Sequence, residues 1–103
     1  EEKDNLLNDQ RFALMFIRSK ANSGFGPYKI KQELQAKHVG KILIAEALVE
    51  LDIDWFKNAT ELYLKRVAQV TDIDIKEKHK QSRYLQNRGF SGEIARDVVG
   101  ELY

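Results

Sequence analysis

Apolar residues recur along this chain with the spacing of α-helices, and strand-type alternation bounded by turn residues is nowhere sustained. In the clearest example, four apolar residues occupy one helical face at i, i+3, i+4 and i+7. They are Ile44, Ala47, Leu48 and Leu51. The pattern predicts an all-α fold with about six helices, expected at residues 9–21, 27–38, 40–51, 54–70, 76–88 and 91 onward.

Capping residues refine these helix ends. Asp9 and Asp54 are predicted N-caps, and Pro27 suits a first helical position because the N–H that it lacks would be unpaired there. The helix that begins after Asp54 is expected to be the longest. Trp55 and Phe56, at its start, are predicted to anchor the packing between the two halves of the chain.

The chain also matches itself weakly when Lys29 is aligned with Lys80. The pairs are then Leu34/Leu85, Gln35/Gln86, Lys37/Arg88, Val39/Phe90, Leu48/Val99, Glu50/Glu101, Leu51/Leu102 and Phe12/Tyr63. We therefore predict two tandem three-helix units, residues 9–51 and 52–103, in an elongated and curved arrangement. Neither unit has enough apolar surface to fold alone, so they must share burial. Residues 1–8 are interpreted as the tail of a preceding repeat.

Charge is strongly segregated along a chain whose net charge is only +1. Residues 18–41 hold six bases against one acid, and residues 76–88 hold five bases against one acid. These two windows sum to +9, which leaves −8 for the rest of the chain. The pattern predicts basic faces directed at an acidic partner or a phosphate backbone, although such runs also occur on ordinary solvated surfaces.

Composition excludes several classes of protein. The chain has no cysteine, so disulfides and cysteine-based zinc sites are impossible, and we expect a cytoplasmic location. Its longest apolar run, residues 12–17, is far shorter than the roughly 20 residues of a membrane span. No cleavable signal pattern opens the chain, so neither membrane insertion nor secretion is expected.

Motifs for catalysis are weak. His38 and His79 lack metal-ligand spacing, and no serine stands in a Gly-x-Ser-x-Gly motif, so we expect neither an enzyme nor a cofactor. The run Gly24–Phe25–Gly26 is interpreted as a turn in which both glycines take positive φ angles and Phe25 enters the core. The acid pairs Asp52/Asp54 and Asp72/Asp74 precede predicted helices and are interpreted as capping residues.

Two ordered sets of residues resemble a known family. The first unit carries Leu6-Leu7-Asn8-Asp9-Gln10-Arg11-Phe12-Ala13, then Gly24-Phe25-Gly26-Pro27, Ile30, Glu33-Leu34 and Lys37. The second carries Asp52-Ile53-Asp54-Trp55, then Lys78, Lys80, Arg83, Tyr84-Leu85 and Arg88-Gly89-Phe90. Over nearly the whole chain, these residues resemble the central and final repeats of the RecX family. His38 departs from the pattern, because this family usually has glycine after the lysine.

The resemblance implies a monomeric regulator that lies in the groove of the RecA–DNA filament and restrains recombinase, ATPase and co-protease activity without chemistry of its own. The resemblance carries over seven basic positions, to which the first basic window adds Arg18 and Lys37. The predicted set for RecA or DNA contact is Arg18, Lys20, Lys29, Lys31, Lys37, Lys78, Lys80, Arg83 and Arg88. The alternative is a three-helix module that binds single- or double-stranded DNA directly, without RecA.

Overall fold

The computed structural model describes the backbone of residues 2–101 and the side chains of residues 9–100. Within that part of the chain it is built from helices and turns alone, which confirms the all-α prediction. The helices are α1 (Glu2–Asn22), α2 (Pro27–Ala36), α3 (Lys41–Leu51), α4 (Trp55–Val67), α5 (Ile75–Asn87) and α6 (Gly92–Glu101).

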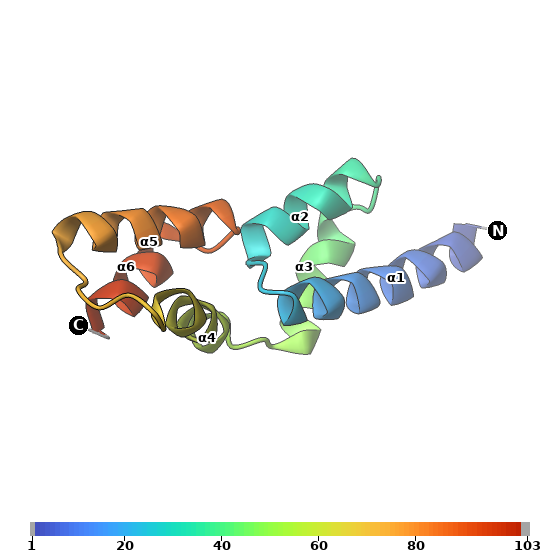
Figure 1. The fold of residues 1–103 in the computed structure, drawn as a ribbon. Helices are drawn as coiled ribbons and strands as arrows, with labels where there is room; N and C mark the ends of the chain where they lie inside the picture. Colours follow the sequence, from blue (N-terminus) through green and yellow to red (C-terminus); the bar gives the residue numbers. More distant parts are fainter. Residues whose placement is uncertain (1, 102–103) are drawn as a thin grey trace.

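The helices form two groups of three, each around its own buried cluster (Figure 1). Helices α1–α3 and the turn after α2 enclose Ala13, Ile17, Ile30, Leu34, Val39, Ile44 and Ala47. Helices α4–α6 and the turn after α5 enclose Ala59, Tyr63, Leu85, Phe90, Ala95, Val98 and Val99. The tandem three-helix arrangement predicted from the sequence is therefore confirmed. Burial is shared less than expected, because each unit has its own cluster and, among the described residues, only Trp55 packs against both.

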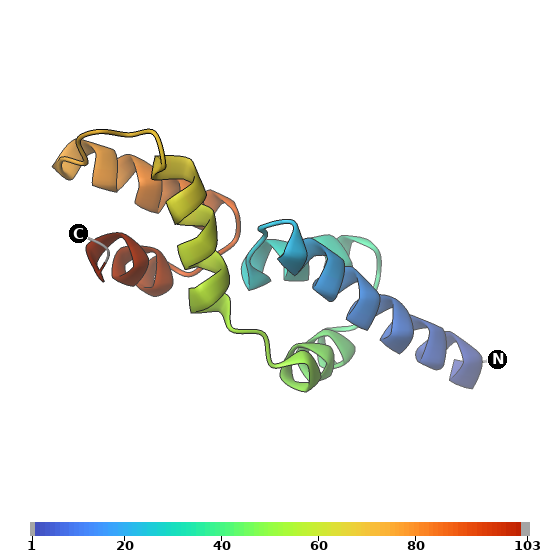
Figure 2. The same ribbon diagram turned by 60° about the horizontal axis from the view of Figure 1, so that its bottom comes forward.

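The two groups follow one another along the long axis of the molecule, as both ribbon views show (Figure 1 and Figure 2). The overall extents are 57 × 18 × 17 Å, and the radius of gyration is 15.8 Å. A compact domain of about 100 residues has a radius of gyration of about 13 Å. The molecule is elongated, as predicted, and exposes long helical surfaces relative to its size.

Two predicted helix extents are wrong. Helix α1 begins at Glu2 and runs through Asp9, so Asp9 is not an N-cap, and with 21 residues α1 is the longest described helix. The segment before Asp9 contains neither proline nor glycine, so nothing in it interrupts the helix. Helix α4 has 13 residues and ends at Val67, not at Val70. Its sequence continues into Val70 and Thr71, whose branched side chains disfavour further helix.

The predicted contacts near the start of α4 are partly confirmed. Asp54 caps α4 by accepting a hydrogen bond of 3.0 Å from the Lys57 N–H. Trp55 packs against both buried clusters and so joins the two units. Phe56, in contrast, is 41% exposed, although its spacing places it on the same face of α4 as Ala59 and Tyr63. It lies in the first turn of the helix, where that face is not fully covered.

The repeat is clearest where the second helix of each unit ends. Leu34 and Leu85 are both fully buried, and His38 and Gly89 take the same left-handed backbone conformation, with φ of 68° and 107°. The predicted pair Phe12/Tyr63 is wrong, because Tyr63 is 1% exposed whereas Phe12 is 42% exposed. The alignment of the two units is therefore correct over their second and third helices but wrong over their first helices.

Candidate partner-binding surface

The C-terminal end of α5 abuts the N-terminal end of α2, so the two helices follow one another in line (Figure 1). The Gly26 N–H donates to the Arg88 carbonyl at 2.8 Å, and the Tyr28 N–H donates to the Gly89 carbonyl at 2.9 Å. The first N–H groups of a helix have no partner within it, so the turn after α5 satisfies those of α2. The negative end of one helix dipole also meets the positive end of the other.

This approach is possible only because the touching residues are glycines. A β-carbon on Gly26 would lie 2.4 Å from the Gly89 carbonyl carbon, and one on Gly89 would lie 2.6 Å from the Lys29 β-carbon. The expectation of positive φ is correct for Gly24, at 90°, and wrong for Gly26, whose φ is −92°. Gly26 is needed for close contact between backbones, not for its own conformation.

Arg88 fastens the same junction with its side chain. Its guanidinium donates from Nη2 to the Ser23 carbonyl at 2.7 Å and from Nε to the Gly24 carbonyl at 3.2 Å. The guanidinium carbon also lies 3.9 Å from the centre of the Phe25 ring. Of the predicted binding residues, Arg88 is thus the one that is committed to contacts between the units.

Lysines of the first unit gather around two phenylalanine rings. Lys20 Nζ lies 4.8 Å from the centre of the Phe25 ring and 5.5 Å from that of Phe16. Lys29 Nζ lies 6.0 Å from the Phe25 ring, and Lys37 Nζ lies 5.9 Å from the Phe16 ring. We call these five residues the aromatic–basic cluster. Lysine heads held over aromatic faces keep their charge at the surface, where a partner can reach it.

One acid and one further ring complete the surroundings of this cluster. Glu33 forms an ion pair of 3.2 Å with Lys20. Phe12, 42% exposed, stacks beside Phe16 with the ring centres 5.6 Å apart. The surface of the first unit is therefore both basic and aromatic, a combination that suits nucleic acid as well as acidic protein.

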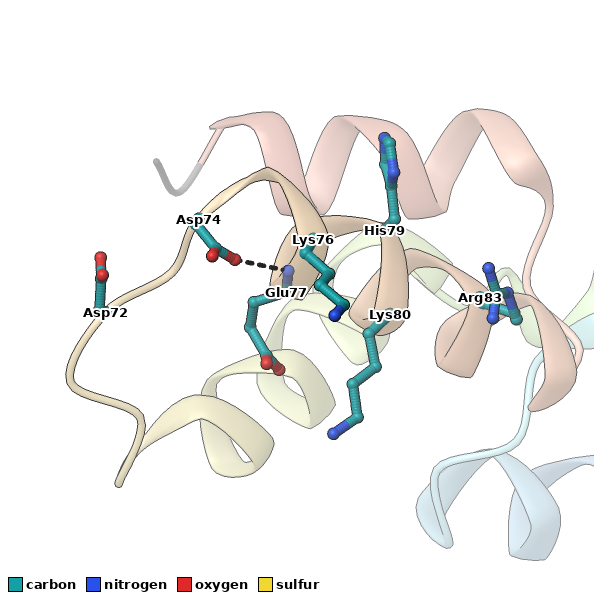
Figure 3. Close-up of a pocket in the computed structure, with 7 residues that line it drawn as sticks. All are labelled: Asp72, Asp74, Lys76, Glu77, His79, Lys80 and Arg83. Atoms are coloured by element: carbon teal, nitrogen blue, oxygen red, sulfur yellow. Dashed lines mark hydrogen bonds between the residues drawn. The ribbon is translucent and has the colours of Figure 1, made fainter.

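Helix α5 carries the basic surface of the second unit. Lys76, Lys80 and Arg83 lie at i, i+4 and i+7 and line a hollow of about 560 Å³ (Figure 3). The remaining lining residues are Asp72, Asp74, Glu77 and His79. Figure 3 shows Lys80 and His79 pointing to opposite sides of the helix. Among the described residues neither Lys80 nor Arg83 forms an ion pair, so both charges are available to a partner.

The two acids nearest these bases have structural roles. Asp74 caps α5 by accepting a hydrogen bond of 2.8 Å from the Glu77 N–H, which confirms its predicted capping function. Glu77 accepts a hydrogen bond from the Gln81 amide, and Arg66 of α4 donates to the Gln81 carbonyl oxygen at 3.1 Å. Arg66 also lies 3.6 Å from the centre of the Tyr84 ring. This network attaches a polar helix to its unit.

Gln81, at 3% exposed, was not predicted to be buried, and it is the polar residue that holds α5 in place. The sequence offers one signal: Gln81 precedes Leu85 by four residues, so the two share a helical face. A glutamine among lysines gives no other indication of burial. Its contact with Arg66 depends on the way α4 and α5 come together.

The structure brings the other predicted site residues together only in part. Lys31 lies on α2 with its Nζ 5.6 Å from the centre of the Tyr28 ring. Arg18 is exposed on α1, and Lys78 is half-buried on α5. Seven of the nine lie on α2 and α5 or on the residues that end them, Lys37 and Arg88. In the described part of the chain, no cluster of three or more histidine or acidic residues could hold a metal.

No described helix combines the length and apolar character that crossing a membrane requires. Residues 8–48 match the family model of the second three-helix domain of RecX, and residues 52–99 match that of the third. The chain belongs to the RecX family. The two matched stretches coincide with the two buried clusters of the fold, one stretch to each cluster.

Individual RecX relatives support the same assignment. The Regulatory protein RecX of Serratia proteamaculans is 40% identical over 98 residues, which cover 95% of this chain and 58% of the relative. That of Haemophilus ducreyi is 40% identical over 90 residues, covering 87% of this chain and 58% of the relative. That of Pseudomonas savastanoi pv. phaseolicola is 32% identical over 100 residues, with coverages of 97% and 62%. The chain thus spans about three-fifths of the length of these relatives.

Proposed function

We propose that this chain binds the RecA–DNA filament as a monomer in the cytoplasm and restrains its ATPase, strand-exchange and co-protease activities. Membership of a family of regulatory proteins supports this function. The observation that carries it here is the end-to-end alignment of α5 and α2, which lines up the basic residues of both units. An elongated molecule with bases along its length suits an extended, acidic and helical partner.

The residues proposed to contact the filament are the predicted set without Arg88, whose side chain is already bound within the molecule. Lys20, Lys29 and Lys37 act from the aromatic–basic cluster, and Lys31 and Arg18 act from other positions on α2 and α1. Lys78, Lys80 and Arg83 act from α5. Their charges supply attraction and orientation, while the acidic remainder of the chain discourages indiscriminate binding of nucleic acid.

The direct test is the single-strand-dependent ATPase activity of RecA, titrated with the chain. We expect the parent to inhibit, and the triple variant Lys29→Glu, Lys31→Glu, Arg83→Glu to require at least tenfold more protein, equivalent to about 1.4 kcal/mol of binding free energy. The control reverses two exposed bases outside the set, Lys57→Glu and Lys65→Glu, and should inhibit as the parent does.

Two results would contradict the proposal. One is equal inhibition by the triple variant and the parent, which would remove the basic residues from the interface. The other is lack of inhibition by the parent and by a version extended to the full length of the relatives.

Direct binding to DNA is the second candidate, and the exposed Phe12 ring beside Phe16 is the observation that favours it. Aromatic side chains stack on unpaired bases, and removing one such contact costs about 1–3 kcal/mol. If this function operates, the chain alone should bind a labelled oligothymidine with steep salt dependence, and Phe12→Ala should weaken that binding about tenfold. Fluorescence anisotropy without RecA measures both effects.

A further inference from the structure

Two close contacts join the described parts of the three-helix units. One is the covalent connection between α3 and α4, where Trp55 packs against both buried clusters. The other is the contact of Gly26 with Gly89, fastened by Arg88. Between these places lies a polar cleft of about 180 Å³, lined by residues 21–24 of the first unit and by Asn58, Glu61, Leu62 and Lys65 of α4. The angle between the units therefore depends on few contacts.

The side chain of Arg88 is suited to holding this angle. Its planar fork bonds two successive carbonyls, of Ser23 and Gly24, while its face stacks on Phe25. Ser23 and Gly24 follow the C-terminal end of α1, where a cation also interacts favourably with the helix dipole. Lysine cannot reproduce this arrangement, because its ammonium has no planar face to stack and no rigid fork of donors.

The equivalent position in the first unit shows that such a contact is not a general property of the repeat. Lys37 ends α2 as Arg88 ends α5, yet its Nζ lies 5.9 Å from the centre of the Phe16 ring, and this ammonium forms no hydrogen bond with another described residue. Beside it stands His38, where the second unit has Gly89. Arg88 and Gly89 thus occur together at the end of α5, which is the helix end that packs against the other unit.

We propose that Arg88 is a positioning residue that locks the angle between the two units, so that α5 and α2 present their basic side chains as one continuous surface. The effect on filament binding rests on the proposed function, whereas the effect on the angle does not. If the lock is lost, each unit keeps its own core but the units rotate about the connection at Trp55. The two basic surfaces then bind as tethered pieces and not as one preorganised surface.

The angle can be measured by double electron–electron resonance, because a chain without cysteine accepts two spin labels without background. Exposed Glu46 on α3 and Asp97 on α6 are replaced by cysteine and labelled. The test variant is Arg88→Lys, which preserves charge, and its control is Arg83→Lys on the same helix. Gly26→Ala is a second test through the backbone contact, and Gly40→Ala is its control, since a β-carbon there meets nothing within 4 Å.

We expect one narrow distance distribution for the parent, Arg83→Lys and Gly40→Ala. For Arg88→Lys and Gly26→Ala we expect a distribution roughly twice as wide, with unchanged helical circular dichroism, because only the preorganising contact is removed. A distribution for Arg88→Lys as narrow as that of the parent would overturn the proposal. So would equal broadening by Arg83→Lys, since the effect would then belong to any change on α5.

Filament binding by the same proteins separates this proposal from the proposed function. Arg88→Lys should bind the filament roughly tenfold more weakly, whereas Gly40→Ala, which changes no basic side chain, should bind nearly as the parent does. If Arg88→Lys broadens the distances but binds like the parent, the positioning role is wrong. If the parent itself does not bind the filament, the proposed function fails, while the distance measurement still decides whether Arg88 locks the angle.

Discussion

The turn after α2 and the turn after α5 have the same backbone shape in opposite surroundings. His38 and Gly89 both take positive φ angles, and the residues that follow them, Val39 and Phe90, are both buried. His38 is exposed, whereas Gly89 lies against Lys29 and Gly26. Because His38 adopts this turn with a side chain, the backbone conformation alone does not require glycine. Glycine is required only at the turn after α5, where the other unit packs against it.

The largest effects are expected in the two cores, where the repeats are most alike. Leu34→Ala and Leu85→Ala each remove a fully buried side chain, and each should lower the free energy of unfolding by about 3 kcal/mol. Urea denaturation measures the loss, and hydrogen exchange should show it mainly in the unit that carries the substitution. Equal loss of protection throughout both units would contradict the picture of two distinct cores.

Gly89→Ala should have the next largest effect. The new β-carbon would lie 2.6 Å from that of Lys29 and 2.7 Å from its backbone nitrogen, at a φ of 107° that disfavours alanine. We expect a loss of about 2 kcal/mol, from steric conflict and left-handed backbone strain together. His38→Ala, at the equivalent turn, is the control and should change the free energy of unfolding little. Similar losses in both variants would mean that the two turns do not differ in their surroundings.

His38→Gly should have the opposite sign. Glycine adopts a φ of 68° without the strain of a β-carbon, so this change should raise the free energy of unfolding by about 0.5–1 kcal/mol. Thermal denaturation followed by circular dichroism is sufficient to detect it. A loss of stability would show that the exposed imidazole has a contact that offsets the backbone strain.

The smallest effect is expected at the ion pair between Lys20 and Glu33, which links α1 to α2. Both side chains remain partly exposed, so solvent screens their attraction, and Glu33→Gln should cost only a few tenths of a kcal/mol. Glu46→Gln on the exposed side of α3 is the matched control. A loss above about 1 kcal/mol, measured by denaturation in low salt, would assign to this pair a larger role than exposed pairs usually have.

Much of the fold follows from the sequence because helical periodicity and capping are local. The spacing of Ile44, Ala47 and Leu51 defines α3 without knowledge of its neighbours, and Asp54 caps α4 as predicted. The errors occur where local signals compete. Asp9 has the chemistry of an N-cap but lies inside a continuous α1, and α4 ends at Val67 although its apolar spacing continues to Val70.

The site was less predictable because its important contacts join residues that are distant in sequence. Its charge and its matching position in the RecX family indicated Arg88 as a binding residue, and nothing near it in the chain indicates that Ser23 and Gly24 would occupy its guanidinium. The burial of Gln81 depends in the same way on Arg66 of another helix. Exposed bases such as Lys80, which need no tertiary partner, were easier to identify.

If bases on both units bind one filament, their loss can be measured by co-sedimentation with preassembled RecA–single-strand filaments. The parent and the control Lys57→Glu, Lys65→Glu should sediment with the filament. Reversal in the first unit, Lys29→Glu with Lys37→Glu, and reversal in the second, Lys80→Glu with Arg83→Glu, should each weaken binding at least about tenfold. Failure of the parent to sediment, or undiminished binding by either reversed variant, would contradict binding of one filament by both units.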